Sequence, residues 1–330
     1  MKVTVIGSGS WGTALAQVLA DNHHEVTIWG RNLDQVVDIF MYHQNEKYFP
    51  GVHFNEAIKA TNDLSSCTDA DMVVLAVPAA AIEEACESIN HVFNSKIPIV
   101  NVAKGFHPTS HKRLSVVIRE TIEPELLYDV VSLIGPSYAE EVVERLLTTV
   151  DAVCENEASS IFVQQAFSND YFRVYRNSDV VGAEIGVAIK NVIAIASGIL
   201  TGIGLGDNAR AALVTRGLAE ISRYGIALGA KPETFLGLTG VGDLVVTCTS
   251  VHSRNFQAGL LIGEQDSSKV FWETNTKTVE GVRTAKVIYE EAVKRGIEMP
   301  ITAQVYKVLY ENALPSESFL ELMTHQLKSE

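Results

Sequence analysis

A lysine inside an apolar run is the first residue of this 330-residue chain to suggest chemistry. Lys190 lies within the stretch 188–194, which is otherwise apolar except for Asn191 and predicts a buried helix. Burying a lysine is costly unless it is paired or used, and desolvation lowers the pKa of an ammonium group. Lys190 is therefore a candidate proton donor and acceptor for a substrate oxygen. The alternative is a surface lysine that extends along the helix to reach water.

Two polar stretches further along the chain have the residue types that bind a small anionic substrate. Asp243 lies in the glycine-rich stretch 238–244 and either orients Lys190, binds a substrate hydroxyl, or caps a helix. Ser253, Arg254 and Asn255 precede a helical pattern. A hydroxyl, a guanidinium group and an amide at a helix start favour a phosphate group. A capped helix without a ligand is the alternative.

A glycine motif near the N-terminus predicts a dinucleotide site. Gly7, Gly9 and Gly12 follow an apolar run of strand length and precede apolar residues at helical spacing. In this context the first glycine permits a tight turn, the second lets the backbone approach a pyrophosphate, and the third lets the helix pack close to the strand. The helix N-terminus then offers N–H groups to the phosphates.

The end of the next predicted strand indicates which dinucleotide is bound. An Asp or Glu at this point would bind the ribose 2′-hydroxyl of NAD, but this chain has Gly30-Arg31. An arginine suits a 2′-phosphate, so NADP is the preferred cofactor and NAD the second choice. A surface arginine without a ligand role is the alternative.

The elements that must position these residues follow an alternating pattern. Strands alternating with helices predict a Rossmann-type, doubly wound, mostly parallel sheet in an α/β fold. Ligands bind beyond the carboxyl ends of such strands, where Gly7, Arg31, Lys104 and Gly135 all lie. The predicted strands are 3–6, 24–29, 71–77, 98–103, 130–134, 150–154 and 171–175.

The character of the sequence changes near residue 180. A long helix is predicted from about 179 to 200, and helical patterns dominate from there to the C-terminus. We therefore expect a dinucleotide-binding domain over 1–180 and an all-α substrate and catalytic domain over 181–330.

Composition narrows the class of protein. A net charge of −14 argues against a nucleic-acid-binding or anionic-membrane-binding surface. Four scattered cysteines predict buried thiols in a reducing compartment, and hence a cytoplasmic protein. The uncharged run 191–206 is short for a membrane span and is interpreted as a buried helix and its exit. The nine histidines form no metal-binding motif, so no metal is expected.

These stretches together resemble the bacterial NAD(P)-dependent glycerol-3-phosphate dehydrogenases over nearly the whole chain. The lysine, aspartate and Ser-Arg-Asn stretches in this order are far more specific than the glycine turn. The stretches that carry the resemblance are 5–14, 102–105, 135–142, 188–192, 240–244, 247–250, 253–255 and 279–281.

The resemblance implies interconversion of sn-glycerol 3-phosphate and dihydroxyacetone phosphate with NADP(H) or NAD(H), supplying glycerol phosphate for phospholipid synthesis. It also implies a homodimer, and Lys190 as the proton acceptor. By the same resemblance, the substrate-contacting residues are Lys104, Gly135, Ser137, Lys190, Asp243, Ser253, Arg254 and Asn255. Besides the glycines, the cofactor-contacting residues are Ser10, Trp11, Arg31, Lys104, Ala139, Arg254, Thr278 and Glu280.

The chain departs from the family pattern at two places. After Glu141 the family tends to have a Pro-Thr pair, whereas this chain has Leu146-Leu147-Thr148-Thr149. At Thr278 the family often has an apolar residue.

Two other functions fit parts of the sequence. A related two-domain dehydrogenase acting on a hydroxy acid or sugar acid would need a carboxylate clamp in place of the phosphate site. A nicotinamide-sensing protein without turnover would not need Lys190.

Overall fold

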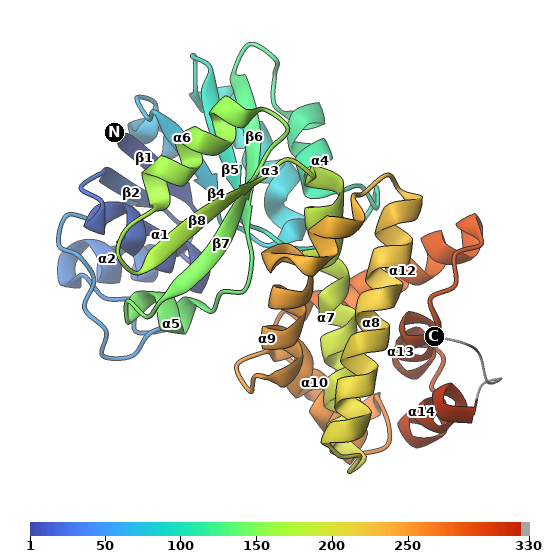
Figure 1. Ribbon diagram of the computed structural model, residues 1–330. Coiled ribbons are helices and arrows are strands. Elements are labelled where there is room, and N and C mark those ends of the chain that lie inside the picture. Colours follow the sequence, from blue (N-terminus) through green and yellow to red (C-terminus); the bar gives the residue numbers. More distant parts are fainter. Residues whose placement is uncertain (325–330) are drawn as a thin grey trace. The chain divides into compact units, whose positions relative to one another are not determined.

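The computed structural model describes residues 1–324, which form two compact units, Met1–Val180 and Val181 onward. The first unit is built on an eight-stranded sheet in the order β3-β2-β1-β4-β5-β6-β7-β8 (Figure 1). Neighbouring strands are parallel except for the antiparallel pair β6 and β7. The strands are β1 (Lys2–Ile6), β2 (Glu25–Trp29), β3 (Lys59–Thr61), β4 (Met72–Leu75), β5 (Ile97–Asn101), β6 (Leu127–Ile134), β7 (Thr148–Val153) and β8 (Phe172–Asn177).

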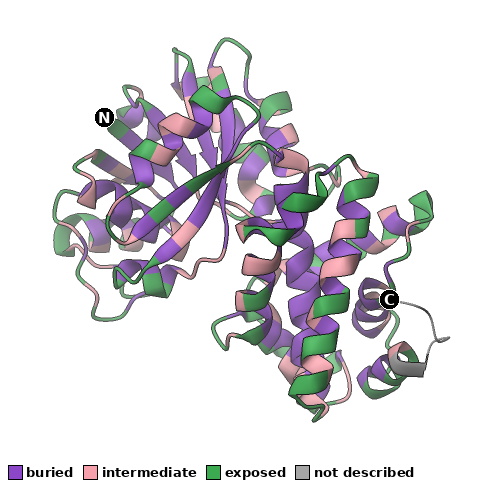
Figure 2. Ribbon diagram, viewed as in Figure 1, coloured by how far each residue is buried: buried purple, intermediate pink, exposed green. Residues whose placement is uncertain are grey.

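Helices cover both faces of this sheet, so the central strands are buried on both sides (Figure 2). Successive side chains of a strand point to opposite faces, so Val3 and Val5 of β1 belong to one core cluster and Ile6 to the other. This double burial explains the nearly continuous apolar runs in the sequence. The helices of the first unit are α1 (Ser10–Asp21), α2 (Leu33–Tyr42), α3 (Ile82–Val92), α4 (Leu114–Thr121), α5 (Ala139–Val143) and α6 (Glu157–Phe167).

The predicted fold class and mostly parallel sheet are confirmed. The sequence did not predict the edge strand β3, because three residues cannot establish an alternating pattern. Leu146-Leu147, where the chain departs from the family pattern, lies directly before a strand. Leu147 is exposed, and β7 begins at Thr148, which pairs with Phe172 of β8.

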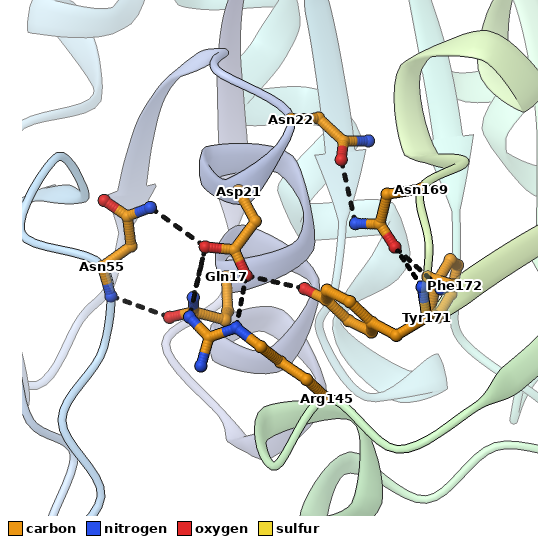
Figure 3. A network of polar contacts seen from close by, with 8 residues as sticks. All are labelled: Gln17, Asp21, Asn22, Asn55, Arg145, Asn169, Tyr171 and Phe172. Carbon is orange, nitrogen blue, oxygen red and sulfur yellow. Dashed lines mark hydrogen bonds and ion pairs between the residues drawn. The ribbon is translucent and has the colours of Figure 1, made fainter.

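A polar network holds the C-terminal end of α1 to three later segments (Figure 3). The Asp21 carboxylate accepts hydrogen bonds from Arg145, Tyr171 and Asn55, as well as from Gln17 on its own helix. Burial raises the pKa of Asp21, but these donors outweigh it and the net shift is downward. The network therefore fixes the helix that follows the glycine turn at the end opposite to that turn.

The second unit is helical, as predicted, and α7 is its most buried helix. Among the described residues α7 alone is long and apolar enough to cross a membrane, yet 89% of its most apolar window is buried inside the protein. The helices are α7 (Val180–Gly202), α8 (Asp207–Ala227), α9 (Asp243–Thr249), α10 (Arg254–Glu264), α11 (Lys269–Thr274), α12 (Glu280–Arg295), α13 (Pro300–Tyr310) and α14 (Pro315–Thr324).

Helices α7 and α10 approach each other closely through four glycines. A Cβ atom added to Gly198 would lie 2.1 Å from the carbonyl oxygen of Phe256, and one added to Gly259 would lie 2.0 Å from that of Ile195. Gly202 and Gly263 make similar approaches one turn further along. Because no side chain separates the two backbones, this contact fixes the position of α10 along α7.

A buried carboxylate joins α8 to the start of α13. Glu220 is 2% exposed and accepts hydrogen bonds from the backbone N–H groups of Ile301 and Thr302 and from the Thr302 hydroxyl. Burial raises the pKa of Glu220 to about 7, although these donors and nearby Arg223 lower it. The folded protein therefore binds this proton more tightly than the unfolded chain does, and stability should fall as the pH rises from the ordinary value of 4.5 through about 7.

Replacing Glu220 by Gln should remove this pH dependence while keeping an acceptor for the helix N-terminus. Between pH 5 and pH 8 the wild type should lose about 2 kcal/mol of unfolding free energy relative to Glu220→Gln, since each pKa unit is worth about 1.4 kcal/mol. Urea unfolding at several pH values measures this difference. Exposed Glu233 provides the control, and Glu233→Gln should follow the wild type. Parallel pH profiles for the wild type and Glu220→Gln would contradict the account.

Candidate active site

The glycine turn has the geometry that a dinucleotide requires. Gly7 has a φ of +125°, and a Cβ atom there would lie 2.4 Å from the carbonyl oxygen of Ala76. A Cβ atom on Gly12 would lie 2.1 Å from the carbonyl oxygen of Gly7, so α1 packs directly on the turn. A Cβ atom on Gly9 would meet nothing within 4 Å. The backbone at Gly9 is thus open to an incoming group, which is the fit that a pyrophosphate needs.

The start of α1 adds donors to this opening. Gly9 is the N-cap and has no side chain to satisfy the first N–H groups of the helix. Ser10 and Trp11, two of the predicted cofactor-contacting residues, form the first turn.

Two side chains support the glycine turn through hydrogen bonds: Gln35 of α2, and Asn45 of the segment that follows α2. Asn45 is fully buried, and its Nδ2 donates to the carbonyl oxygen of Ser8 at 3.1 Å and to Thr13 Oγ1 at 2.9 Å. Ser8 Oγ donates to Gln35 Oε1 at 3.0 Å. The sequence does not predict these roles of Asn45 and Gln35, because they lie far from the motif and neither has a characteristic spacing.

Arg31 follows the carboxyl end of β2, as predicted. Its guanidinium group lies 2.7 Å from Glu84 in the first turn of α3, and both side chains are more than half exposed. The positive charge of Arg31 is therefore paired with a carboxylate of the same chain, that of Glu84.

Three predicted substrate-contacting residues of the first unit meet at one carbonyl group. Lys104 Nζ donates to the carbonyl oxygen of Gly135 at 3.0 Å, and Ser137 Oγ donates to the same oxygen at 3.1 Å. A Cβ atom on Gly135 would lie 3.0 Å from the Cα atom of Val150, so the chain passes close to β7 here. Ala139, a predicted cofactor-contacting residue, begins α5 and is buried.

In the second unit Lys190 forms a buried ion pair. Its side chain is 6% exposed, and its Nζ lies 2.5 Å from Asp243 Oδ1 and 2.7 Å from Thr247 Oγ1. Asp243 is the first residue of α9 and Gly242 is its N-cap, so Asp243 pairs with Lys190 rather than capping the helix. The sequence did not predict Thr247 as a partner of Lys190, although its position four residues after Asp243 on one helix places both on the same face.

A glycine on α7 lets the segment before α9 approach the helix that carries Lys190. A Cβ atom on Gly186 would lie 2.4 Å from the carbonyl oxygen of Thr239, so the segment leading into α9 lies directly against α7, one turn before Lys190.

The stretch Ser253–Asn255 begins α10, and Ser253 is its N-cap through a hydrogen bond from Phe256 N. Asn255 Nδ2 donates to Asn191 Oδ1, and Asn255 Oδ1 accepts from the backbone N–H of Gly281. This places Asn255 beside the residue that follows Lys190, a link that the sequence did not predict.

The remaining predicted cofactor-contacting residues lie at the start of α12. Burial raises the pKa of Glu280, and the positive charges of Arg283 and Arg254 act in the opposite direction. Arg254 and Glu280 are therefore within electrostatic reach of each other. Thr278 precedes α12 and is exposed.

Two open pockets lie along β8, with volumes of about 620 and 580 Å³. Neither is lined by a residue predicted to contact substrate or cofactor, and their walls include exposed Arg173 and Tyr175. The buried contacts of Lys190 with Asp243 and Thr247 therefore indicate the candidate active site better than these two pockets do.

Comparisons with known proteins identify the family of the chain. The family model described as NAD-dependent glycerol-3-phosphate dehydrogenase N-terminus matches residues 2–160, and the C-terminus model of the same family matches residues 179–320. A protein of Enterococcus faecalis named glycerol-3-phosphate dehydrogenase (NAD(P)+) is 48% identical over 330 residues, covering 100% of this chain and 97% of the relative. The chain belongs to the NAD-dependent glycerol-3-phosphate dehydrogenase family.

Other members of the glycerol-3-phosphate dehydrogenase family show the same likeness. The Geobacillus thermodenitrificans relative is 51% identical over 331 residues, covering 100% of this chain and 96% of the relative. The crystal structure of a glycerol-3-phosphate dehydrogenase from Coxiella burnetii superimposes with a TM-score of 0.91 at 36% identity, covering 98% of this chain and 99% of that one. The likeness therefore extends over both units.

Replacing Asp243 by Asn should destabilise the protein by about 3–5 kcal/mol, because the buried ammonium of Lys190 loses its carboxylate. Urea unfolding measures the loss. The double variant Lys190→Met/Asp243→Asn, which removes both charges, should recover most of it. A Asp243→Asn protein as stable as the wild type would show that the pair is not held as the structure has it.

Proposed function

We propose that this protein interconverts sn-glycerol 3-phosphate and dihydroxyacetone phosphate using NAD(P)H, and so supplies glycerol phosphate for phospholipid synthesis. The observation that carries the proposal is the buried contact of Lys190 on α7 with Asp243 and Thr247 on α9, because a lysine held in this way can transfer a proton. Membership of the glycerol-3-phosphate dehydrogenase family supports the choice of substrate.

The cofactor binds at the glycine turn of the first unit. When bound, its nicotinamide supplies or accepts a hydride. The open backbone at Gly9 and the first turn of α1, with Ser10 and Trp11, hold the pyrophosphate. Arg31 binds a 2′-phosphate, which favours NADP over NAD. The other proposed cofactor-contacting residues are Gly7, Gly12, Lys104, Ala139, Arg254, Thr278 and Glu280.

Lys190 moves the proton. In the reducing direction its ammonium group donates a proton to the oxygen on C2 of dihydroxyacetone phosphate as that carbon gains the hydride, and the amine is left neutral. In the oxidising direction the neutral amine takes the hydroxyl proton. Asp243 and Thr247 hold Nζ in position, since both contact it directly.

The substrate phosphate is bound by Arg254 and Asn255 at the start of α10, with Ser253 capping that helix. The contact of Asn255 with Asn191 ties this phosphate site to the lysine. Lys104, Gly135, Ser137 and Asp243 complete the proposed set of substrate-contacting residues.

The protein also acts as a cytoplasmic homodimer with no stable membrane insertion and no nucleic-acid partner. Four buried free thiols fit a reducing compartment, and the net charge of −14 disfavours polyanions.

The assay of function follows loss of reduced-nicotinamide absorbance on adding dihydroxyacetone phosphate, with NADPH and NADH in parallel. We expect turnover with this substrate, and none with unphosphorylated dihydroxyacetone or with 2-oxo acids. Turnover of 2-oxo acids instead would favour a hydroxy-acid dehydrogenase. Nucleotide binding without turnover of any of these substrates would favour a sensor.

Replacing Lys190 by Met should lower kcat by about 10²–10⁴-fold while nucleotide binding is retained. The double variant Lys190→Met/Asp243→Asn, which leaves no lone buried carboxylate, should be equally inactive. Lys286→Met, at an exposed site on α12, is the control and should keep wild-type turnover. Near-normal kcat in a folded Lys190→Met protein would exclude Lys190 as the proton donor.

Light scattering of the purified protein tests the proposed assembly. The chain has a mass of 35.9 kDa, so the dimer should give twice this value at micromolar concentration. A single species at the mass of one chain would contradict it.

A further inference from the structure

The order of the strands places one ion pair across the dinucleotide crevice. Strands β2, β1 and β4 are consecutive neighbours, and the direction of strand order reverses between β1 and β4. In such sheets the dinucleotide lies in the crevice at this reversal, beyond the carboxyl ends of the strands. Arg31 follows β2, whereas Glu84 is in the first turn of α3, after β4. Their contact at 2.7 Å therefore passes from one side of β1 to the other.

The guanidinium group of Arg31 thus has two possible anionic partners, a phosphate and a carboxylate. In the proposed function it binds the 2′-phosphate of NADP, and in the structure it binds the Glu84 carboxylate. The neighbouring acid Glu83 contacts His107 Nε2 at 3.4 Å instead, so Glu84 is the acid of this turn that contacts Arg31. A 2′-phosphate that reached Arg31 would also approach the negative charge of Glu84.

The pair is weak enough to exchange. The side chains of Arg31 and Glu84 are 58% and 60% exposed, and ion pairs in water contribute only about 0.2–1 kcal/mol. A phosphate dianion can therefore displace the carboxylate, but it does so against this attraction and against carboxylate–phosphate repulsion. NAD has no 2′-phosphate and is not subject to either effect.

We propose that Glu84 is a specificity-determining residue, which lowers the preference for NADP over NAD by competing with the 2′-phosphate for Arg31. This inference rests on the proposed function, because it assigns Arg31 to the 2′-phosphate. It gives a structural reason for an enzyme of this build to accept both cofactors.

The test measures dissociation constants for NADPH and NADH by nucleotide fluorescence in wild type and Glu84→Gln. The Gln variant keeps the size of the side chain and removes its charge. We expect NADPH to bind about 3–10-fold more tightly, because a full competing charge is lost, and NADH to change by less than about twofold. Glu87→Gln, on the exposed side of α3 one turn further along, is the matched control and should leave both constants unchanged.

A double-mutant cycle shows whether the effect acts through Arg31. Arg31→Ala should lose most of the preference for NADPH, and adding Glu84→Gln to it should have a much smaller effect on NADPH binding than in the wild type, because only the carboxylate–phosphate repulsion is left to remove. Raising the salt concentration should reduce the difference between wild type and Glu84→Gln, since the competition is between exposed charges.

Three results would overturn the inference. An unchanged ratio of the two constants in Glu84→Gln would do so, as would an equal effect of Glu87→Gln, which would indicate net charge alone. A full Glu84→Gln effect in the Arg31→Ala background would also do so. A wild-type protein that binds neither nucleotide would instead overturn the proposed function itself.

Discussion

The ion pair between Lys190 and Asp243 is the interaction on which the helical unit depends. Both side chains are almost completely buried, and removing two charges from water costs several kcal/mol per ion. Only close contact and additional hydrogen bonds offset this cost, and Thr247 supplies one. The glycine at 186 lets the segment that leads into α9 lie directly against α7, one turn before Lys190. The glycines between α7 and α10 extend the same close packing to the helix that carries Arg254 and Asn255.

The sheet unit follows a different principle, in which bare backbone forms the proposed cofactor site and side chains support it. The turn at Gly7–Gly12 presents bare backbone, so its shape must be held from outside. Asn45 does this with no exposure to solvent, and the Asp21 network fixes the far end of the same helix. At the carboxyl end of β2, Arg31 adds a positive charge that contacts Glu84.

Much of the fold could be predicted because its signals are local. The apolar strands of the parallel sheet, the glycine turn and the long apolar helix each depend on residues adjacent in sequence. Lys190 could be identified for the same reason, since a charge inside such a helix is conspicuous. The partners could not: Asn45 reaches Ser8 across 37 residues and Thr247 reaches Lys190 across 57, and the sequence contains no pattern at such separations. Glu84 and Glu220 were equally hidden, because an acid in the first turn of a helix or within a helix is ordinary until its partner is known.

The apolarity of α7 has a consequence for biosynthesis. Its 23 residues leave the ribosome before the helices that cover them, and the rest of the chain takes roughly 6–25 s to follow at about 5–20 residues per second. During that time α7, which is long and apolar enough to cross a membrane, lacks the neighbours that bury it in the folded protein. Lys190 lies near its middle, where a charged residue opposes insertion by about 2.5–3.5 kcal/mol. The residue proposed to transfer the proton thus also makes α7 a poorer membrane segment than its length and apolar residues alone would make it.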